Sequence, residues 1–282
     1  KKYILHILYI SLPYWLALFL GVIFFKVDVI LLSLLEDPAI ADTSIALYAL
    51  PMKIVEVGMM YGTIFLNSLL PVLTTAIEKK DTSKIHSLTG KWFELLFWFG
   101  LAIAVFWFIY TPEIIRIIST PEFVSTAIFG YTSMEAMRIV IWIFLFYFIS
   151  SLSMYILIAR GEQSRMMWIN AIIALLNIIG NLVFIPMYSF IGSAWVTLVT
   201  QILLMMITWW YVRDTIQYKK SIIFASIMSI VAIIGIYVAI FSGKFIGVWD
   251  GIISILLRLS IAGIIFWSCY LGWWWIIRKK IL

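Results

Sequence analysis

Charge, cysteine and histidine are all scarce in this sequence, and each shortage excludes a class of protein. Charged residues make up only 12% of the chain, whereas a soluble domain carries about 25%. The one cysteine, Cys269, excludes a disulfide framework within the chain. The two histidines lie outside the long apolar runs, and no DDxxD-like or Gly-x-Ser-x-Gly motif is present. We therefore predict no catalytic residue and no metal site.

Hydrophobic residues are abundant in this sequence and make up 64% of it. A helix needs about 20 apolar residues to cross the hydrocarbon core of a bilayer. The sequence predicts an all-α polytopic membrane protein with a bend or interfacial lead-in at Pro13. We expect eight spans, at about residues 13–35, 46–77, 92–118, 133–158, 166–186, 191–213, 221–242 and 250–277.

The loops between these spans alternate in charge, which orients the chain in the membrane. Fourteen of the 20 Lys and Arg residues fall in one alternate set of termini and loops. The positive-inside rule then predicts both ends of this chain on the cytoplasmic side of the inner membrane. The net charge of +6 does not indicate nucleic-acid binding, because the basic residues form no patch on a soluble module.

Four basic residues lie inside apolar spans, where charge is costly: Lys26, Lys53, Arg138 and Arg258. At about 1.5 Å of rise per residue, we expect all four roughly 8–14 Å below the outer surface. Ionisable groups at membrane depth usually face a bundle interior or a wet cavity. The four cations therefore predict a path for an anionic substrate. The alternative for Arg138, nearest a helix end, is that it extends to the lipid headgroups.

Acidic residues accompany these cations. The spacing i, i+3 allows ion pairs between Lys53 and Glu56 and between Glu135 and Arg138. Lys26 and Asp28 are two residues apart and point to different sides, so each needs a partner from another helix. The alternative for Lys53 and Glu56 is an ion pair that only fixes helix packing.

Two spans also carry polar stripes at helical spacing. In the second span the stripe comprises Lys53, Glu56, Thr63, Asn67 and Thr74, opposite a GxxxG pair, Gly58 and Gly62. In the fifth span the stripe comprises Asn170, Asn177 and Asn181. Such stripes indicate either substrate contacts or interhelical hydrogen bonds.

Several short motifs, in this order along the chain, match one family of transporters. They are Phe25-Lys26-Val27-Asp28, Tyr48-Ala49-Leu50-Pro51-Met52-Lys53, Asn67-Ser68-Leu69-Leu70-Pro71, Arg160-Gly161-Glu162-Gln163 and Asn177-Ile178-Ile179-Gly180-Asn181. With these motifs the chain resembles the C-terminal half of an O-antigen type polysaccharide flippase. That family belongs to the multidrug/oligosaccharidyl-lipid/polysaccharide exporter superfamily.

The resemblance implies two six-helix lobes around a central cavity. Residues 1–213 would be the C-terminal lobe, and residues 214–282 would be two additional transmembrane helices. The partner would be the missing N-terminal lobe of the same protein, which is consistent with a chain that begins with Lys1 instead of Met.

The resemblance also implies transport of undecaprenyl-pyrophosphate-linked oligosaccharide from the inner to the outer leaflet, for lipopolysaccharide or another cell-envelope polysaccharide. Lys26, Asp28 and Lys53 match positions in the family's charged cavity. Depth and helix face add further candidate substrate-binding residues: Glu56, Asn67, Arg138, Asn177, Asn181 and Arg258. We expect no cofactor beyond a coupling proton or sodium ion at Asp28 or Glu56. The expected partners, besides the missing lobe, are membrane lipid and the lipid-linked sugar.

Two other functions compete with this interpretation. An ion-coupled multidrug exporter of the same superfamily would favour acids in the cavity, because its substrates are usually cationic. A membrane-embedded lipid-linked glycosyl or prenyl transferase would need an acidic metal cluster or a catalytic His or Ser, which the sequence does not offer.

Overall fold

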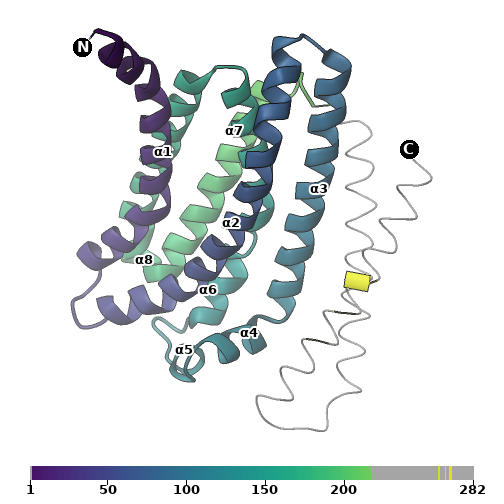
Figure 1. Ribbon diagram of the computed structural model, residues 1–282. Coiled ribbons are helices and arrows are strands. Elements are labelled where there is room, and N and C mark those ends of the chain that lie inside the picture. The colour runs from purple at the N-terminus through teal and green to yellow at the C-terminus, as the bar shows by residue number, and fades with distance from the viewer. Residues whose placement is uncertain (1, 217–259, 261–263, 265–266, 269–282) are drawn as a thin grey trace.

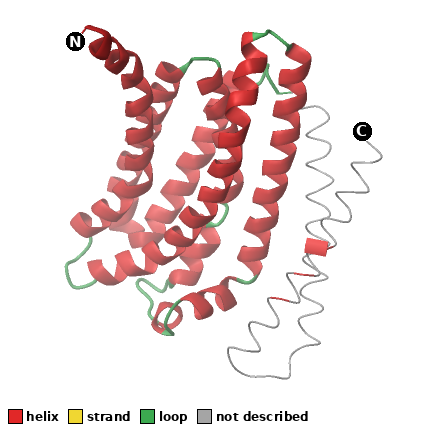
Figure 2. Cartoon of the chain, in the orientation of Figure 1, coloured by secondary structure: helices red, strands yellow, loops and turns green. Residues whose placement is uncertain are grey.

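The computed structural model describes residues 2–216, together with residues 260, 264, 267 and 268. Over these residues the long elements are helices joined by short loops, which confirms the all-α polytopic fold (Figures 1 and 2). The helices are α1 (Lys2–Leu35), α2 (Ala41–Glu78), α3 (Thr82–Ile109), α4 (Thr111–Ile118), α5 (Glu122–Ser125), α6 (Ser133–Val140), α7 (Ile143–Ala159) and α8 (Gln163–Val212).

The candidate membrane-spanning segments overlap the expected ones, and the third begins ten residues before the expected span 92–118. By length and hydropathy the candidates are Ser11–Leu35, Ala41–Glu78, Thr82–Ile109, Ser133–Ala159 and Gln163–Val212. The last segment crosses twice, because Ser189 has a non-helical backbone (φ 55°, ψ −143°) and the chain folds back on itself. Gly180 consequently lies against Val196. The predicted spans 166–186 and 191–213 are therefore the two arms of α8.

Two further spans are interrupted where the sequence predicted continuous helices. The span expected at 92–118 breaks at Tyr110, where α3 ends, and α4 begins with Pro112 in its first turn. Proline suits this position because the first helical N–H groups have no intrahelical acceptor. The span expected at 133–158 is divided into α6 and α7 around residues 141–142. The predicted spans 221–242 and 250–277 lie outside the described residues, apart from four positions.

The loops alternate between the two ends of the bundle, as the charge pattern predicts. The N-terminus, the α2–α3 loop and the α7–α8 loop lie at one end, which we call the basic end, and α4 and α5 lie at the other (Figure 1). α1 stays helical through Pro13, while its first turns lean away from the axis of the rest (Figure 1).

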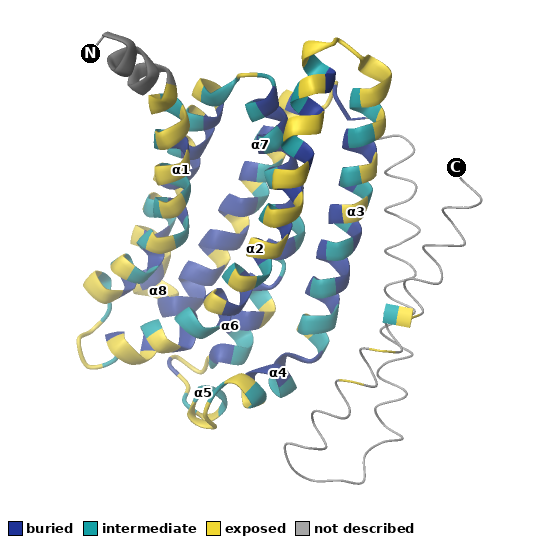
Figure 3. Ribbon diagram, viewed as in Figure 1, coloured by how far each residue is buried: buried dark blue, intermediate teal, exposed yellow. Residues whose placement is uncertain are grey.

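The core forms around α7. α8 packs against α1 and α7, and α7 also packs against α2 and α3. Buried residues therefore gather on α7 and on the helix faces turned toward it (Figure 3). The GxxxG pair of α2 meets α7 directly, since a Cβ at Gly58 or Gly62 would approach the ring of Phe144 or Phe148 to 2.1–2.2 Å. This confirms the close helix packing that the motif predicts.

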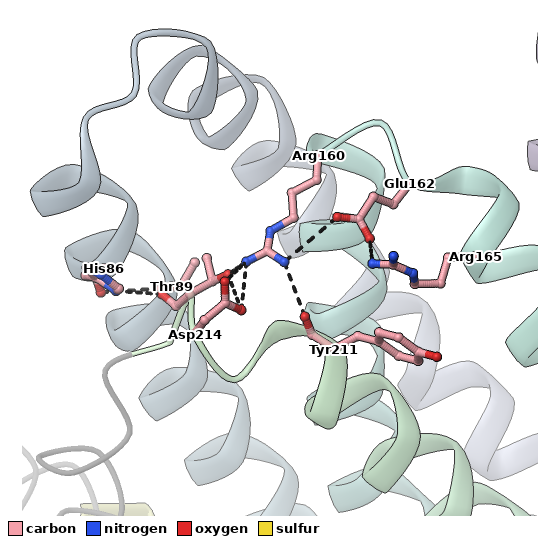
Figure 4. Close-up of polar contacts among 8 residues, drawn as sticks. His86, Thr89, Arg160, Glu162, Arg165, Tyr211 and Asp214 are labelled. Carbon is pink, nitrogen blue, oxygen red and sulfur yellow. Dashed lines mark hydrogen bonds and ion pairs between the residues drawn. The ribbon is translucent and has the colours of Figure 1, made fainter.

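Polar contacts at the basic end join three helices (Figure 4). Arg160, at the end of α7, donates to both carboxylate oxygens of Asp214 at 3.0 Å and to the Tyr211 carbonyl oxygen at 3.2 Å. The hydroxyl of Thr89 on α3 donates to the Thr215 carbonyl oxygen at 2.9 Å. Partial burial raises the pKa of the Asp214 carboxyl, but hydrogen bonds and charge from Arg160 hold it below its ordinary value. The end of α8 is thereby fixed to α3 and α7.

The contact between α2 and α7 predicts an asymmetry between two Gly→Ala variants. Gly62→Ala should destabilise the protein by about 1–3 kcal/mol, because the added methyl overlaps the buried Phe148 ring. Gly21→Ala is the matched control, since its nearest neighbour is the Asn170 amide nitrogen at 3.8 Å. Thermal unfolding of the two purified variants in one detergent measures the difference. Equal melting temperatures would contradict the close contact.

Candidate functional site

A cavity of about 560 Å³ lies between α1, α2, α7 and α8. Its walls are mainly apolar and aromatic, with tyrosines at positions 14, 147 and 155 and methionines at 59, 60, 154 and 166. Among its lining residues, Lys26 and Glu56 are the only ones that carry a full charge. The lining runs from Tyr14 to Lys26 along α1, which is about 18 Å at the helical rise.

Lys26, Glu56 and Lys53 form one charged cluster, in which Lys26 and Glu56 line the cavity and Lys53 lies beside Glu56 outside the lining. The Lys26 ammonium lies 2.5 Å from Glu56 Oε1, and the Lys53 ammonium lies 3.9 Å from Glu56 Oε2. These contacts confirm the i, i+3 pair on α2 and the prediction that the partner of Lys26 comes from another helix. With two cations and one anion, the Lys26–Glu56–Lys53 cluster has a net charge of +1.

Asp28 lies on a different side of α1, as its spacing from Lys26 predicts. Its side chain is fully buried and does not line the cavity. It accepts hydrogen bonds from the Tyr48 hydroxyl of α2 and, at 3.5 Å, from the Thr197 hydroxyl of α8. Asp28 therefore joins three helices. A binding role for it stays a prediction.

The polar stripe of α2 follows the same wall of the cavity. Glu56 and Thr63 line it, and the Thr63 hydroxyl lies 3.2 Å from that of Tyr147. Asn67 is exposed and accepts a hydrogen bond of 2.6 Å from Tyr155. The cavity tyrosines were missed by the sequence analysis. Tyr147 and Tyr155 of α7 do share a helical face with Ser150, Ser151, Met154 and Ile158, and that periodicity could have identified them.

The asparagines of α8 divide between the cavity and the core. Asn170 lines the cavity and donates to the Ala17 carbonyl oxygen at 2.8 Å. Asn177 and Asn181 are fully buried between the two arms of α8. The Asn177 amide donates to the Thr200 hydroxyl at 3.3 Å, and Asn181 Oδ1 accepts from the Ser193 hydroxyl at 2.6 Å. The geometry matches the interhelical alternative for these two residues, and a substrate role for them stays a prediction.

Arg138 does not join the Lys26–Glu56–Lys53 cluster. Arg138 is exposed on α6 and does not line the cavity. The ion pair predicted between Glu135 and Arg138, both described residues, is not formed. Glu135 instead accepts hydrogen bonds from the Thr132 backbone N–H at 2.8 Å and hydroxyl at 2.6 Å, as the capping box of α6. Arg258 lies outside the described residues.

Comparison with known proteins assigns this arrangement to a family. The sequence model of the MatE family matches residues 13–183. No curated protein matches the chain. Among solved structures, a lipid II flippase, MurJ, in an inward closed conformation is similar with a TM-score of 0.74 and 17% identity, covering 100% of this chain and 56% of the other.

Two other solved structures are also similar. One is a MOP superfamily transporter from Pyrococcus furiosus, described as having a binding pocket of reverse polarity that suggests a different function, with a TM-score of 0.55. The other is an outward-facing multidrug resistance MATE family transporter of the MOP superfamily, with a TM-score of 0.56. Each is 16% identical to this chain, and each match covers 93% of this chain. This chain spans 61% of the length of the first and 64% of the length of the second. At this identity the likeness shows the fold.

The buried Asp28–Tyr48 contact predicts that Tyr48→Phe costs more stability than Tyr155→Phe. Removal of the Tyr48 hydroxyl takes a donor from a fully buried carboxylate and should cost about 1–3 kcal/mol. The Tyr155 hydroxyl serves an exposed amide, which other donors can reach, so its loss should cost less. Melting temperatures in detergent by fluorescence-detected size exclusion measure both. A smaller loss for Tyr48→Phe would contradict the assigned role.

Proposed function

The chain belongs to the MatE family, and on that basis we propose that it forms the C-terminal lobe of a polysaccharide flippase. The substrate is undecaprenyl-pyrophosphate-linked oligosaccharide of the O-antigen type, moved from the inner to the outer leaflet of the cytoplasmic membrane. Residues 214–282 add two transmembrane helices in this proposal. A second lobe of the same protein closes the cavity, and both ends of this chain face the cytoplasm.

The observation that carries the proposal is the pairing of two cations with one anion in the Lys26–Glu56–Lys53 cluster, of which Lys26 and Glu56 line the cavity. Lys26 from α1 and Lys53 from α2 both lie within 4 Å of Glu56. A pyrophosphate in a low-dielectric site needs charged donors, and two ammonium groups on neighbouring helices supply them. Their side chains remain 53% and 74% exposed, and Lys26 lies on the cavity wall, so an anion in the cavity can reach Lys26 directly.

The remaining wall suits a sugar. Hydroxyl-bearing tyrosines and small polar side chains alternate with methionines along α2 and α7. Aromatic rings pack against the apolar faces of sugar rings, while phenol and amide groups bond to sugar hydroxyls. The cavity continues from Lys26 toward Tyr14 and the basic end, so a headgroup bound at the cluster leaves room for attached sugars.

The position of the charged cluster at one end of the cavity suits transport by alternating access. A cavity open toward the cytoplasm would bind the pyrophosphate at its closed outer end, at Lys26 and Lys53. Rocking of the two lobes against each other would then open that end outward, while the lipid tail stays in the bilayer. Asp28 or Glu56 would bind the coupling proton or sodium ion in this scheme.

One observation favours a second candidate, an ion-coupled multidrug exporter. Glu56 lines a largely apolar cavity, which is an arrangement that suits an amphipathic cation. The fold is common to a lipid flippase and to a multidrug transporter, so it does not choose between the two. The net positive charge of the cluster favours the anionic substrate.

The experiment uses the longest reading frame that encodes this chain, in a strain where the gene can be depleted. Depletion should cause undecaprenyl-pyrophosphate-linked oligosaccharide to accumulate, as measured by mass spectrometry of membrane lipids. Wild type should reverse the accumulation, whereas Lys26→Gln and Lys53→Gln should restore less than about a tenth of export. Lys84→Gln is the matched control, because Lys84 is exposed at the basic end.

Immunoblots of membrane fractions establish that each variant is present at the wild-type level. Full export by Lys26→Gln would contradict the cationic site. Unchanged lipid-linked oligosaccharide on depletion, together with increased sensitivity to cationic dyes, would favour the multidrug exporter.

A further inference from the structure

The Lys26–Glu56–Lys53 cluster already contains an anion, and we propose that Glu56 is an internal counterion that competes with the substrate's phosphate. The carboxylate partly neutralises the two lysines in the empty carrier and gives way when pyrophosphate binds. This inference rests on the proposed function, because it concerns how that site binds and releases its substrate.

The geometry places Glu56 where it must compete. One carboxylate oxygen lies 2.5 Å from the Lys26 ammonium, and the other lies 3.9 Å from the Lys53 ammonium. A phosphate that contacts both ammonium groups therefore comes within a few ångströms of the Glu56 carboxylate. Like charges at that distance repel strongly where the dielectric constant is low. The phosphate must displace the carboxylate or bind beside it at a loss of affinity.

The three side chains of the cluster differ in their exposed fractions. The side chain of Glu56 is 23% exposed, whereas those of Lys26 and Lys53 are 53% and 74% exposed. Lys26 and Glu56 both lie on the cavity wall, and Lys53 lies beside Glu56 as the most exposed of the three. Each ammonium has three donors, so the lysines can exchange partners without leaving the cluster.

Glu56 is the acid in position for this role. Among the described lining residues of the cavity, it is the one carboxylate. Asp28 is on the same helix as Lys26, but it is fully buried and held by Tyr48 and Thr197. Asp28 therefore stabilises the helix packing, and Glu56 remains to neutralise the lysines at the cavity.

A transport cycle needs such a group at two steps. The empty carrier must return through a low-dielectric state, where two adjacent uncompensated cations are unfavourable. Release also requires that the anion be replaceable, because a site of charge +2 would hold pyrophosphate too long. Glu56 meets both needs by restoring a charge of +1 whenever the phosphate leaves.

The proposal predicts opposite effects on binding and on transport in Glu56→Gln. This near-isosteric change removes the charge and should raise the affinity for pyrophosphate by about tenfold, with slower dissociation. Export by the same variant should fall below that of wild type, because release and return become limiting. Glu122→Gln is the matched control, since Glu122 is exposed on α5 and does not line the cavity.

Binding is measured on the purified full-length protein with farnesyl pyrophosphate as the probe and farnesol as the uncharged reference. Glu56→Asp provides a second variant that keeps the charge on a shorter side chain, and its affinity should stay within about threefold of wild type. In a Lys26→Gln background, Glu56→Gln should raise the affinity for farnesyl pyrophosphate by less than it does in wild type. One of the two lysine contacts for which the carboxylate and the phosphate compete is already gone in that background.

The outcomes separate this inference from the function on which it rests. Suppose that wild type binds farnesyl pyrophosphate more tightly than farnesol, but that Glu56→Gln binds farnesyl pyrophosphate no more tightly than wild type does. Glu56 is then not a competitor, and the flippase proposal still holds. If Glu56→Gln and Glu56→Asp lose affinity alike, the residue only shapes the site, and the counterion role is rejected. If wild type shows no preference for the pyrophosphate, the proposed function itself fails.

Discussion

The structure depends on one constraint, which is that charge and backbone polar groups inside a membrane must be compensated within the protein. Helices provide hydrogen-bond partners for the backbone polar groups, and ionisable side chains of α1 and α2 are compensated by contacts between the two helices. Lys26 pairs with Glu56, and Asp28 accepts a hydrogen bond from Tyr48. Both contacts run between the same two helices, so compensation of charge also sets how α1 and α2 lie together.

These two contacts begin at residues that lie two apart within one turn of α1 and point to different sides of it. The Asp28 contact also reaches Thr197 on α8 and is closed to the cavity. The Lys26 contact lies on the cavity wall, with side chains that remain partly exposed. The buried contact thus positions the exposed one. A change at Asp28 would therefore move the lysines at the site, even though Asp28 does not itself touch the cavity.

Hydropathy and charge spacing predicted much of this fold, because crossing a membrane imposes length and polarity directly on the sequence. The fold back at Ser189 and the ion pair of Lys53 with Glu56 agree with the predictions. Position around a helix was harder to predict, since depth places Asn177 beside the substrate path whereas the neighbouring arm of α8 covers it. The error at Glu135 was avoidable, because Thr132-Ser133-Met134-Glu135 fits the capping-box pattern.

The electrostatics of the cavity depend on few side chains. The walls supplied by α1, α2, α7 and α8 are mostly apolar, and few of their side chains set the sign of the field. In this chain the balance is +1, and it depends on a single carboxylate between two lysines. Loss of Glu56 would double the net charge of the cluster to +2, and loss of one lysine would bring it to zero. Under the proposed function, the charge of the substrate that this chain accepts therefore depends on a few residues at the cavity wall.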